Sequence, residues 1–127
     1  METDNLNIPS IPNLVEQYFT AWSSKDIDTL RTLLADNCVV KDWDNHVVGK
    51  ENVLEFNQNF FNIVGTNTAT LVNKAIRYSK GPYIGQEPIL VFCELEIVVD
   101  NNSPLKVVDL LTFDLNFKIS EIQAYKQ

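Results

Sequence analysis

The sequence predicts an α+β fold, in which three N-terminal helices pack on a curved antiparallel sheet. Segments with apolar residues at helical spacing are confined to residues 11–64. Four long β-prone segments follow, at about 68–79, 88–99, 105–115 and 118–125, and turn-forming residues separate them. Helices that precede a run of consecutive strands are typical of α+β proteins, and a curled sheet closed by helices encloses a cone-shaped pocket.

The first helix is predicted to begin near Pro12, since proline is favoured in the first turn of a helix. Apolar side chains at helical spacing then form one stripe: Leu14, Val15, Tyr18, Phe19 and Trp22. Tyr18 is therefore expected on the buried side of this helix. A second, shorter helix should follow the N-cap Asp26, carry Leu34 on its apolar side and end near residues 36–37.

A β-prone segment at residues 38–43 comes next, followed by a polar turn and a short return strand at 47–48. Asp42 is thus expected near the end of the first strand. The third helix should run from Gly49 to a C-cap at Gly65, because glycine is the usual residue just beyond a helix.

Residues 11–127 are predicted to form one domain behind a flexible leader at residues 1–10. The net charge is −7 and the Lys and Arg residues are scattered, which argues against a nucleic-acid partner. The longest apolar run, 89–93, is too short for a bilayer, so we expect a cytoplasmic protein without a membrane partner. Cys38 and Cys93 are expected as buried thiols, and a single His predicts no metal site.

Side chains alternate between the two faces of a strand, and this alternation predicts that Asp109 lies on an apolar face. In the run from Leu105 to Phe113 it shares one face with Val107, Leu111 and Phe113. Burial without a partner disfavours the ionised form of a carboxyl group. We therefore expect Asp109 either to meet hydrogen-bond donors or to have a pKa well above neutrality.

Three stretches of the chain resemble the ketosteroid isomerase and SnoaL-like branch of the nuclear transport factor 2-like superfamily, which has a cystatin-like fold. They are VEQYFTAW at 15–22, LADNCVVKD at 34–42 and VVDLLTF at 107–113. The order of the predicted elements is also similar, so that the resemblance covers the chain from about Ile11 onward. Asn57 differs from the pattern, since some members carry a supporting tyrosine there.

The resemblance implies a catalytic trio and a reaction. Asp42 corresponds to the acid that shuttles a proton, while Tyr18 and Asp109 correspond to the two groups that donate hydrogen bonds to the substrate oxygen. Such an enzyme moves a carbon–carbon double bond into conjugation with a ketone and needs no cofactor. In ketosteroid isomerases an apolar site keeps one carboxylic acid neutral so that it can donate, and the resemblance implies the same for Asp109. A homodimer is usual in these relatives and is expected here.

The expected substrate or ligand is an apolar small molecule. Six residues are predicted to line its pocket: Trp22, Trp43, Phe56, Phe60, Phe92 and Leu111. Two other functions stay open, a noncatalytic binder of a lipid-like or aromatic molecule and a SnoaL-type lyase or cyclase. Simpler structural roles also stay open: Tyr18 and Asp109 as a buried hydrogen-bonded pair, Asp42 as an exposed turn residue, and the aromatic residues as plain core.

Overall fold

The computed structural model describes residues 9–78 and 89–127 and confirms the predicted α+β class. The elements are α1 (Ile11–Ser23), α2 (Ile27–Leu33), β1 (Leu34–Lys41), β2 (His46–Val48), α3 (Lys50–Ile63), β3 (Asn67–Tyr78), β4 (Ile89–Val99), β5 (Leu105–Phe113) and β6 (Ile119–Lys126). The leader predicted at 1–10 lies outside the described residues except for Pro9 and Ser10. The turn-forming residues predicted between the segments at 68–79 and 88–99, Gly81 and Pro82, also lie outside them.

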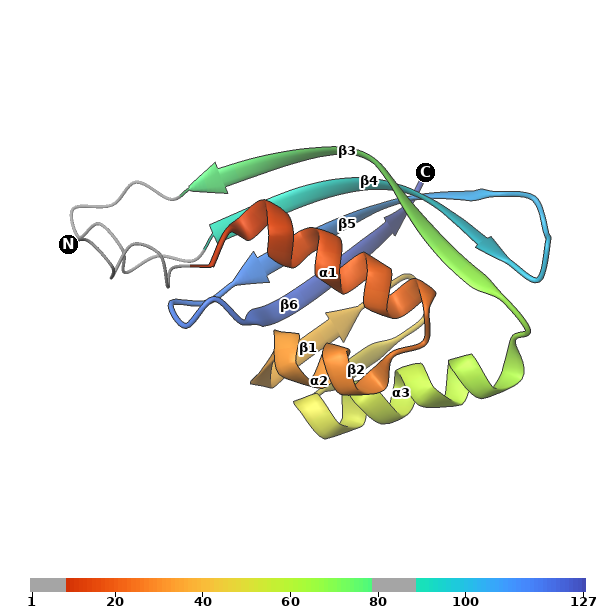
Figure 1. The fold of residues 1–127 in the computed structure, drawn as a ribbon, viewed down its shortest axis with the longest axis horizontal. Helices are drawn as coiled ribbons and strands as arrows, with labels where there is room; N and C mark the ends of the chain where they lie inside the picture. The colour runs from red at the N-terminus through yellow and green to blue at the C-terminus, as the bar shows by residue number, and fades with distance from the viewer. Residues whose placement is uncertain (1–8, 79–88) are drawn as a thin grey trace.

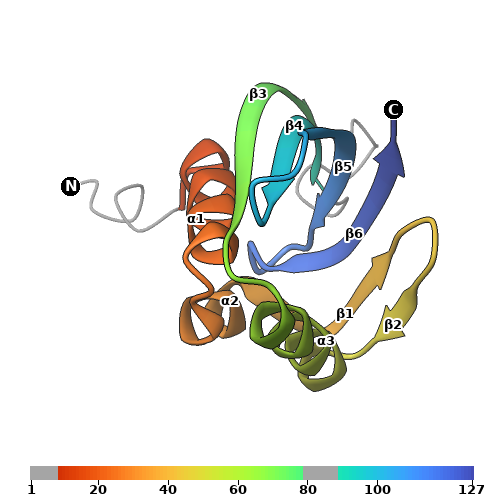
Figure 2. The same cartoon turned by 90° about the vertical axis from the view of Figure 1, so that its right-hand side faces the viewer.

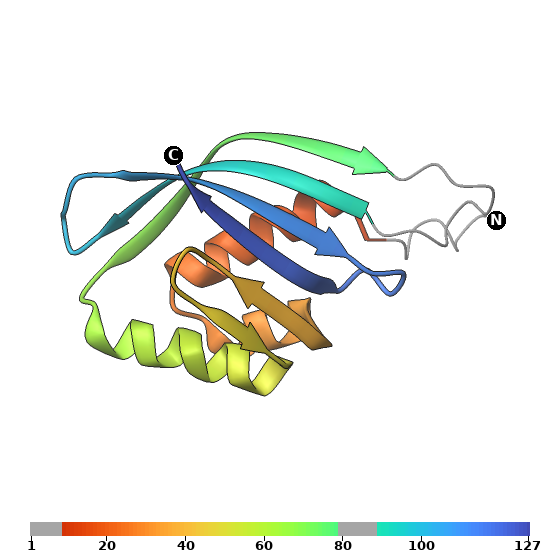
Figure 3. The same cartoon turned by 180° about the vertical axis from the view of Figure 1, so that it is seen from behind.

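The six strands form one curled sheet with the helices on its inner side. Figure 1 shows α1 lying along the sheet, and Figure 2 shows α1 beside β3 at one side of the curved sheet, with α3 at the lower end. Helix α1 contacts β3, whereas α3 contacts β1 and β2. Figure 3 shows the outer face of the sheet, which the helices of the described residues leave uncovered.

The sheet order is β2-β1-β6-β5-β4-β3. The predicted meander from β3 to β6 is confirmed, since each neighbouring pair in it is antiparallel. One pairing differs from an all-antiparallel sheet, because β1 runs parallel to β6. The last strand of the meander therefore joins the β1–β2 hairpin to the rest of the sheet.

The start of the first strand differs from the sequence prediction. Leu34 was expected on the second helix, but that helix ends at Leu33 and Leu34 already pairs with Ile119 of β6. The parallel register then shifts before Val39, so that the exposed pair Asp36 and Asn37 falls in an irregular part of the strand. A short apolar run has no period of its own, and here pairing with a distant strand decided its conformation.

The core forms between α1 and the inner face of the sheet. The predicted apolar stripe of α1 is confirmed in its centre, since Val15, Tyr18 and Phe19 are all buried. Helix α1 begins at a Ser10 cap whose hydroxyl accepts a hydrogen bond from the Asn13 backbone. These interactions fix the helix that carries Tyr18.

A lysine side chain caps α3 at its C-terminal end. Gly65 was predicted as the C-cap, but Val64 occupies that position. The Lys25 Nζ donates hydrogen bonds to the carbonyl oxygens of Phe61, Val64 and Gly65, at 3.2, 2.7 and 3.1 Å. The Gly65 backbone N–H donates instead to Asp100 Oδ1, and a Cβ on Gly65 would come within 2.9 Å of that oxygen. Glycine is needed there for close approach.

Replacing Lys25 by Met should lower the free energy of unfolding by about 1–3 kcal/mol, because three carbonyl groups lose a charged donor. Methionine keeps the length of the side chain and has the same backbone restriction at the positive φ of this position, 59°. Urea unfolding followed by circular dichroism measures the change. The exposed Lys74→Met variant is the control, and equal stability of the two variants would contradict the capping role of Lys25.

Candidate active site

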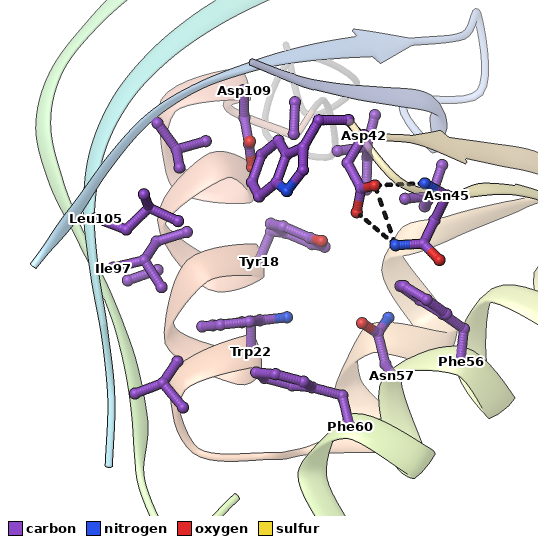
Figure 4. Close-up of a pocket in the computed structure, with 17 residues that line it drawn as sticks. Tyr18, Trp22, Asp42, Asn45, Phe56, Asn57, Phe60, Ile97, Leu105 and Asp109 are labelled. Atoms are coloured by element: carbon purple, nitrogen blue, oxygen red, sulfur yellow. Dashed lines mark hydrogen bonds between the residues drawn. The ribbon is translucent and has the colours of Figure 1, made fainter. Parts of the chain in front are cut away.

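A cavity of about 330 Å³ opens between α1, α3 and the inner face of the sheet. This volume lies at the lower end of the range for small-molecule sites, roughly 300–1,000 Å³. Most of the lining side chains are apolar, and no Lys or Arg in the described ranges is among them. Apart from two tryptophans, the polar lining residues are Tyr18, Asp42, Asn45, Asn57 and Asp109. Figure 4 shows these side chains around one space.

Tyr18 reaches the cavity from the middle of α1. Its side chain is 6% exposed, and its ring packs edge-on against Phe19 with 5.1 Å between the centroids. Burial raises the pKa of Tyr18 well above its ordinary value, and the negative charge of Asp109 adds to this. The phenol therefore keeps its proton at physiological pH and serves as a hydrogen-bond donor.

Asp109 faces the cavity from β5, on the buried side that the alternation predicts. It is 8% exposed. Burial raises the pKa of its carboxyl group to about 7, and the negative charge of Asp42 contributes less. The sequence prediction placed this pKa well above neutrality, so the structure gives a smaller shift. This carboxyl group can therefore hold its proton at a pH where an ordinary aspartate is ionised.

Tyr18 and Asp109 do not form the hydrogen-bonded pair that a purely structural role would require. Within residues 9–78 and 89–127, neither side chain has a hydrogen-bond partner in the protein. Their oxygens are not enclosed, because among the described residues Asn67 Oδ1 is the one enclosed side-chain polar atom without a partner. Both groups open onto the cavity, where water or a bound molecule can supply the partner that buried polar groups normally have.

Asp42 lies just beyond the end of β1 and is half-buried. Its Oδ1 accepts hydrogen bonds from the backbone N–H groups of Asp44 and Asn45, at 2.8 and 2.6 Å, and from Asn45 Nδ2 at 3.0 Å. Among the residues that the structure describes, its Oδ2 accepts only from Asn45 Nδ2, at 3.2 Å. Asp42 is thus a turn residue and a cavity residue at once: Oδ1 holds the turn, and Oδ2 keeps capacity for a further hydrogen bond.

Four of the six residues predicted to line the pocket do so: Trp22, Trp43, Phe56 and Phe60. Trp22 and Phe60 stack with 5.8 Å between their centroids and join α1 to α3. Trp43 is 42% exposed, and the Lys126 Nζ lies 5.0 Å from its ring centroid.

Phe92 and Leu111 do not line the cavity, which corrects the sequence prediction. Phe92 alternates with the buried Val91 and Cys93, so it lies on the outer face of the sheet with Glu94 and is 41% exposed. Leu111 is on the inner face, but it is fully buried in the core. Strand alternation could have excluded Phe92, whereas the burial of Leu111 depends on how distant segments pack around it in the core.

Two further polar residues line the cavity, Asn45 and Asn57, and neither was predicted from the sequence. Asn45 orients Asp42, and the spacing of three residues in a polar turn was the available signal. Asn57 stands on the buried side of α3 with Val53 and Phe61 and is 8% exposed. A polar residue within an apolar helical stripe was the signal at this position.

The two cysteines are not part of the site. Cys38 and Cys93 are fully buried, and burial raises the pKa of each thiol to about 12. A thiol in this state is a poor nucleophile, because the thiolate is the reactive form. The described ranges contain no group of three or more His, Cys, Asp or Glu side chains placed to hold a metal ion. No helix in the same ranges has both the length and the apolar character to cross a membrane.

A family model for the SnoaL-like domain matches residues 15–121. The chain belongs to the SnoaL-like domain family. No curated protein matches the sequence. The matched span contains Tyr18, Asp42 and Asp109, the three proposed catalytic residues.

Solved structures share the fold of this SnoaL-like domain. A proposed dehydratase of the nuclear transport factor 2-like family from Streptomyces avermitilis superimposes with a TM-score of 0.77 at 15% identity, covering 98% of this chain and 99% of that one. A proposed ketosteroid isomerase from Kribbella flavida gives 0.71 at 16% identity, covering 92% and 77%. A proposed polyketide cyclase from Sinorhizobium meliloti gives 0.66 at 19% identity, covering 94% and 96%. At these identities the likeness establishes the fold.

Proposed function

We propose that the protein catalyses proton transfer on a neutral, apolar carbonyl compound and moves a carbon–carbon double bond into conjugation through an enolate. The observation that carries this proposal is the pair of carboxyl groups in one apolar cavity, of which one is half-buried and the other has a pKa raised to about 7. Two acids whose environments differ in this way suit the separate roles of base and hydrogen-bond donor.

Asp42 is the base in this mechanism. Its carboxylate removes a proton from the carbon between the carbonyl group and the double bond, and the electron pair of that C–H bond moves to the carbonyl oxygen to give a dienolate. The same carboxyl group then returns the proton to the far end of the dienolate. Oδ2 is the oxygen suited to this transfer, because Oδ1 already accepts three hydrogen bonds in the turn. The reaction is an isomerisation, so it needs no oxidant, reductant or cofactor.

Tyr18 and protonated Asp109 stabilise the dienolate oxygen. Both are neutral donors without a partner in the described protein, so their bonds strengthen as negative charge develops on the substrate. The apolar lining favours this, because electrostatic interactions are stronger where water is excluded.

The direct test is an absorbance assay with β,γ-unsaturated ketones, from a single ring to a steroid. Conversion to the conjugated isomer increases ultraviolet absorbance, so turnover is read without a coupling enzyme. We expect at least one of these compounds to be isomerised at a rate proportional to protein concentration. An unchanged spectrum for every compound that binds in the cavity would contradict the proposed reaction.

The activity should fall as the pH rises above 7. A raised pKa means that Asp109 is protonated below pH 7 and loses its proton above it, so the second donor disappears on the alkaline side. The expected decline in kcat/KM approaches about tenfold per pH unit. The Asp109→Asn variant should be slower but should lack this decline, because an amide donates at every pH. If kcat/KM of Asp109→Asn still declines above pH 7, the decline is caused by the titration of another group.

A dehydratase or cyclase reaction of the SnoaL type is the second candidate, favoured by the family match and by the proposed dehydratase and cyclase among the similar structures. It would use the same acid and base on a hydroxylated substrate. Loss of water is separable from isomerisation by product mass. A noncatalytic binder of an apolar ligand is the third candidate and would leave every substrate unchanged.

We also propose a cytoplasmic homodimer that associates through the outer face of the sheet. Phe92 on this face is 41% exposed, and Val72, at the irregularity of β3, is 59% exposed. Burying them against a second copy would be favourable. Light scattering measures the mass in solution, and a monomer at all concentrations would exclude this assembly.

A further inference from the structure

The cavity contains a polar group that the proposed reaction does not use. Asn57 lines the cavity from α3 and is 8% exposed, yet its amide forms no side-chain hydrogen bond among the described residues. Its amide atoms are also not sealed in the core, since in the described ranges Asn67 Oδ1 is the one enclosed polar atom without a partner. The Asn57 amide therefore opens onto the cavity.

The surroundings of Asn57 would suit an apolar residue. Val53 and Phe61 precede and follow it by one helical turn on the same helix and are both buried. Phe56 and Phe60 line the cavity on either side of it. An amide in such a position contacts water only through the cavity and gains no partner among the described residues, and asparagine is also a weak helix former. The free protein is thus less stable than it would be with leucine, which is common where a residue serves ligand binding.

Asn57 lies on a different wall of the cavity from the two proposed donors to the carbonyl oxygen. Asp109 projects from β5 and Tyr18 from α1, whereas Asn57 projects from α3 beside Phe60, which stacks on Trp22. Figure 4 shows the Asn57 amide across the cavity from the Asp109 carboxyl, with Tyr18 between them and with Trp22 and Phe60 to one side. A molecule whose carbonyl oxygen lies at Tyr18 and Asp109 would extend across the cavity toward Asn57.

We propose that Asn57 is a specificity-determining residue that binds a neutral hydroxyl or keto oxygen at the end of the substrate remote from the reacting carbonyl. An amide both donates and accepts hydrogen bonds, which matches an uncharged oxygen group. A carboxylate or phosphate does not fit, because two aspartates and no described Lys or Arg line the cavity. This inference rests on the proposed function for the placement of the carbonyl, and it names the class of substrate as bifunctional.

Binding can be tested apart from turnover with saturated bicyclic ketones. The three probes are a decalone, its hydroxy derivative and its diketone, with the second oxygen on the ring remote from the first. The chain has two tryptophans, Trp22 and Trp43, and both line the cavity, so intrinsic fluorescence reports binding directly. We expect the wild type to bind the hydroxydecalone or the diketone about tenfold more tightly than the decalone.

The Asn57→Leu variant should bind all three probes with equal affinity and should have a melting temperature at or above that of the wild type. Asn59→Leu is the matched control, because Asn59 is exposed on the opposite side of the same helix and should keep the wild-type preference. Asn57→Ala removes the amide without adding volume, and it should lose the preference in the same way.

The inference is overturned if the wild type has no preference for a remote oxygen, or if Asn57→Leu or Asn57→Ala keeps that preference. A lower melting temperature of Asn57→Leu would also overturn it, since it would assign the amide a structural role. Failure of the proposed function looks different: the probes still bind with a preference that depends on Asn57, while no β,γ-unsaturated ketone is isomerised.

Discussion

Replacing Asp42 by Asn should lower kcat for the isomerisation by about 10²- to 10⁴-fold, the usual contribution of a positioned general base. An amide has almost the shape of a carboxylate, and its oxygen can still accept the backbone hydrogen bonds from Asp44 and Asn45. The turn should therefore persist while the group that takes the proton is lost. KM should change little, because Tyr18 and Asp109 hold the substrate oxygen.

The control for this experiment is Asp44→Asn, which makes the same chemical change two residues away on an exposed side chain. Its activity should stay within about twofold of the wild type, because surface changes of this kind have small effects. Near-ultraviolet circular dichroism checks that both variants keep the native packing. If Asp42→Asn and the control are equally active, Asp42 is not the base, and the turn alone explains its position.

Replacing Asp109 by Asn should remove a pH-dependent loss of stability of about 4 kcal/mol. The pKa of this carboxyl rises from 3.8 to about 7 on folding, and each unit corresponds to about 1.36 kcal/mol. Below pH 3.8 the folded and unfolded chains both hold the proton. Between pH 3.8 and 7 only the folded chain holds it, so the wild type loses stability as the pH rises. Above pH 7 the loss is complete and stays constant.

Urea unfolding of the wild type and Asp109→Asn at pH 4, 5.5, 7 and 8 measures this effect. The other carboxyl groups titrate in both proteins, so the difference in free energy of unfolding isolates Asp109. Between pH 4 and 7 the free energy of unfolding of the Asn variant should rise relative to that of the wild type. The control Asp44→Asn should show a constant difference from the wild type, and a constant difference for Asp109→Asn would contradict the buried, unpaired carboxyl.

The sequence predicted those features that depend on local periodicity. The stripe of α1 placed Tyr18 on the buried side, and the alternation of β5 placed Asp109 on the inner face. Both patterns of apolar residues repeat over several helical turns or strand positions, so a single polar residue does not obscure them. The positions of helices and strands followed for the same reason, apart from the junction at Leu34.

Features that depend on contacts between distant segments could not be predicted. The parallel pairing of Leu34 with Ile119 joins residues far apart in the sequence, and so does the Lys25 cap on α3. Leu111 was correctly expected on the inner face of β5, but it is fully buried in the core and does not reach the cavity. Asn57 was recognisable in the sequence as a polar residue in an apolar stripe. That it faces a cavity could not be predicted, because the cavity also needs α1 and the sheet on its other sides.

The parallel pairing of β1 with β6 has a consequence for the order of assembly during synthesis. β6 lies between β1 and β5 in the sheet, although it is translated after every other strand. Asp42 follows β1 and Asp109 lies on β5, and β6 is the strand that pairs with both. These two parts of the sheet are therefore joined only after the ribosome has released β6. Until then each sheet fragment exposes an unpaired edge, the kind of surface through which incompletely folded chains associate.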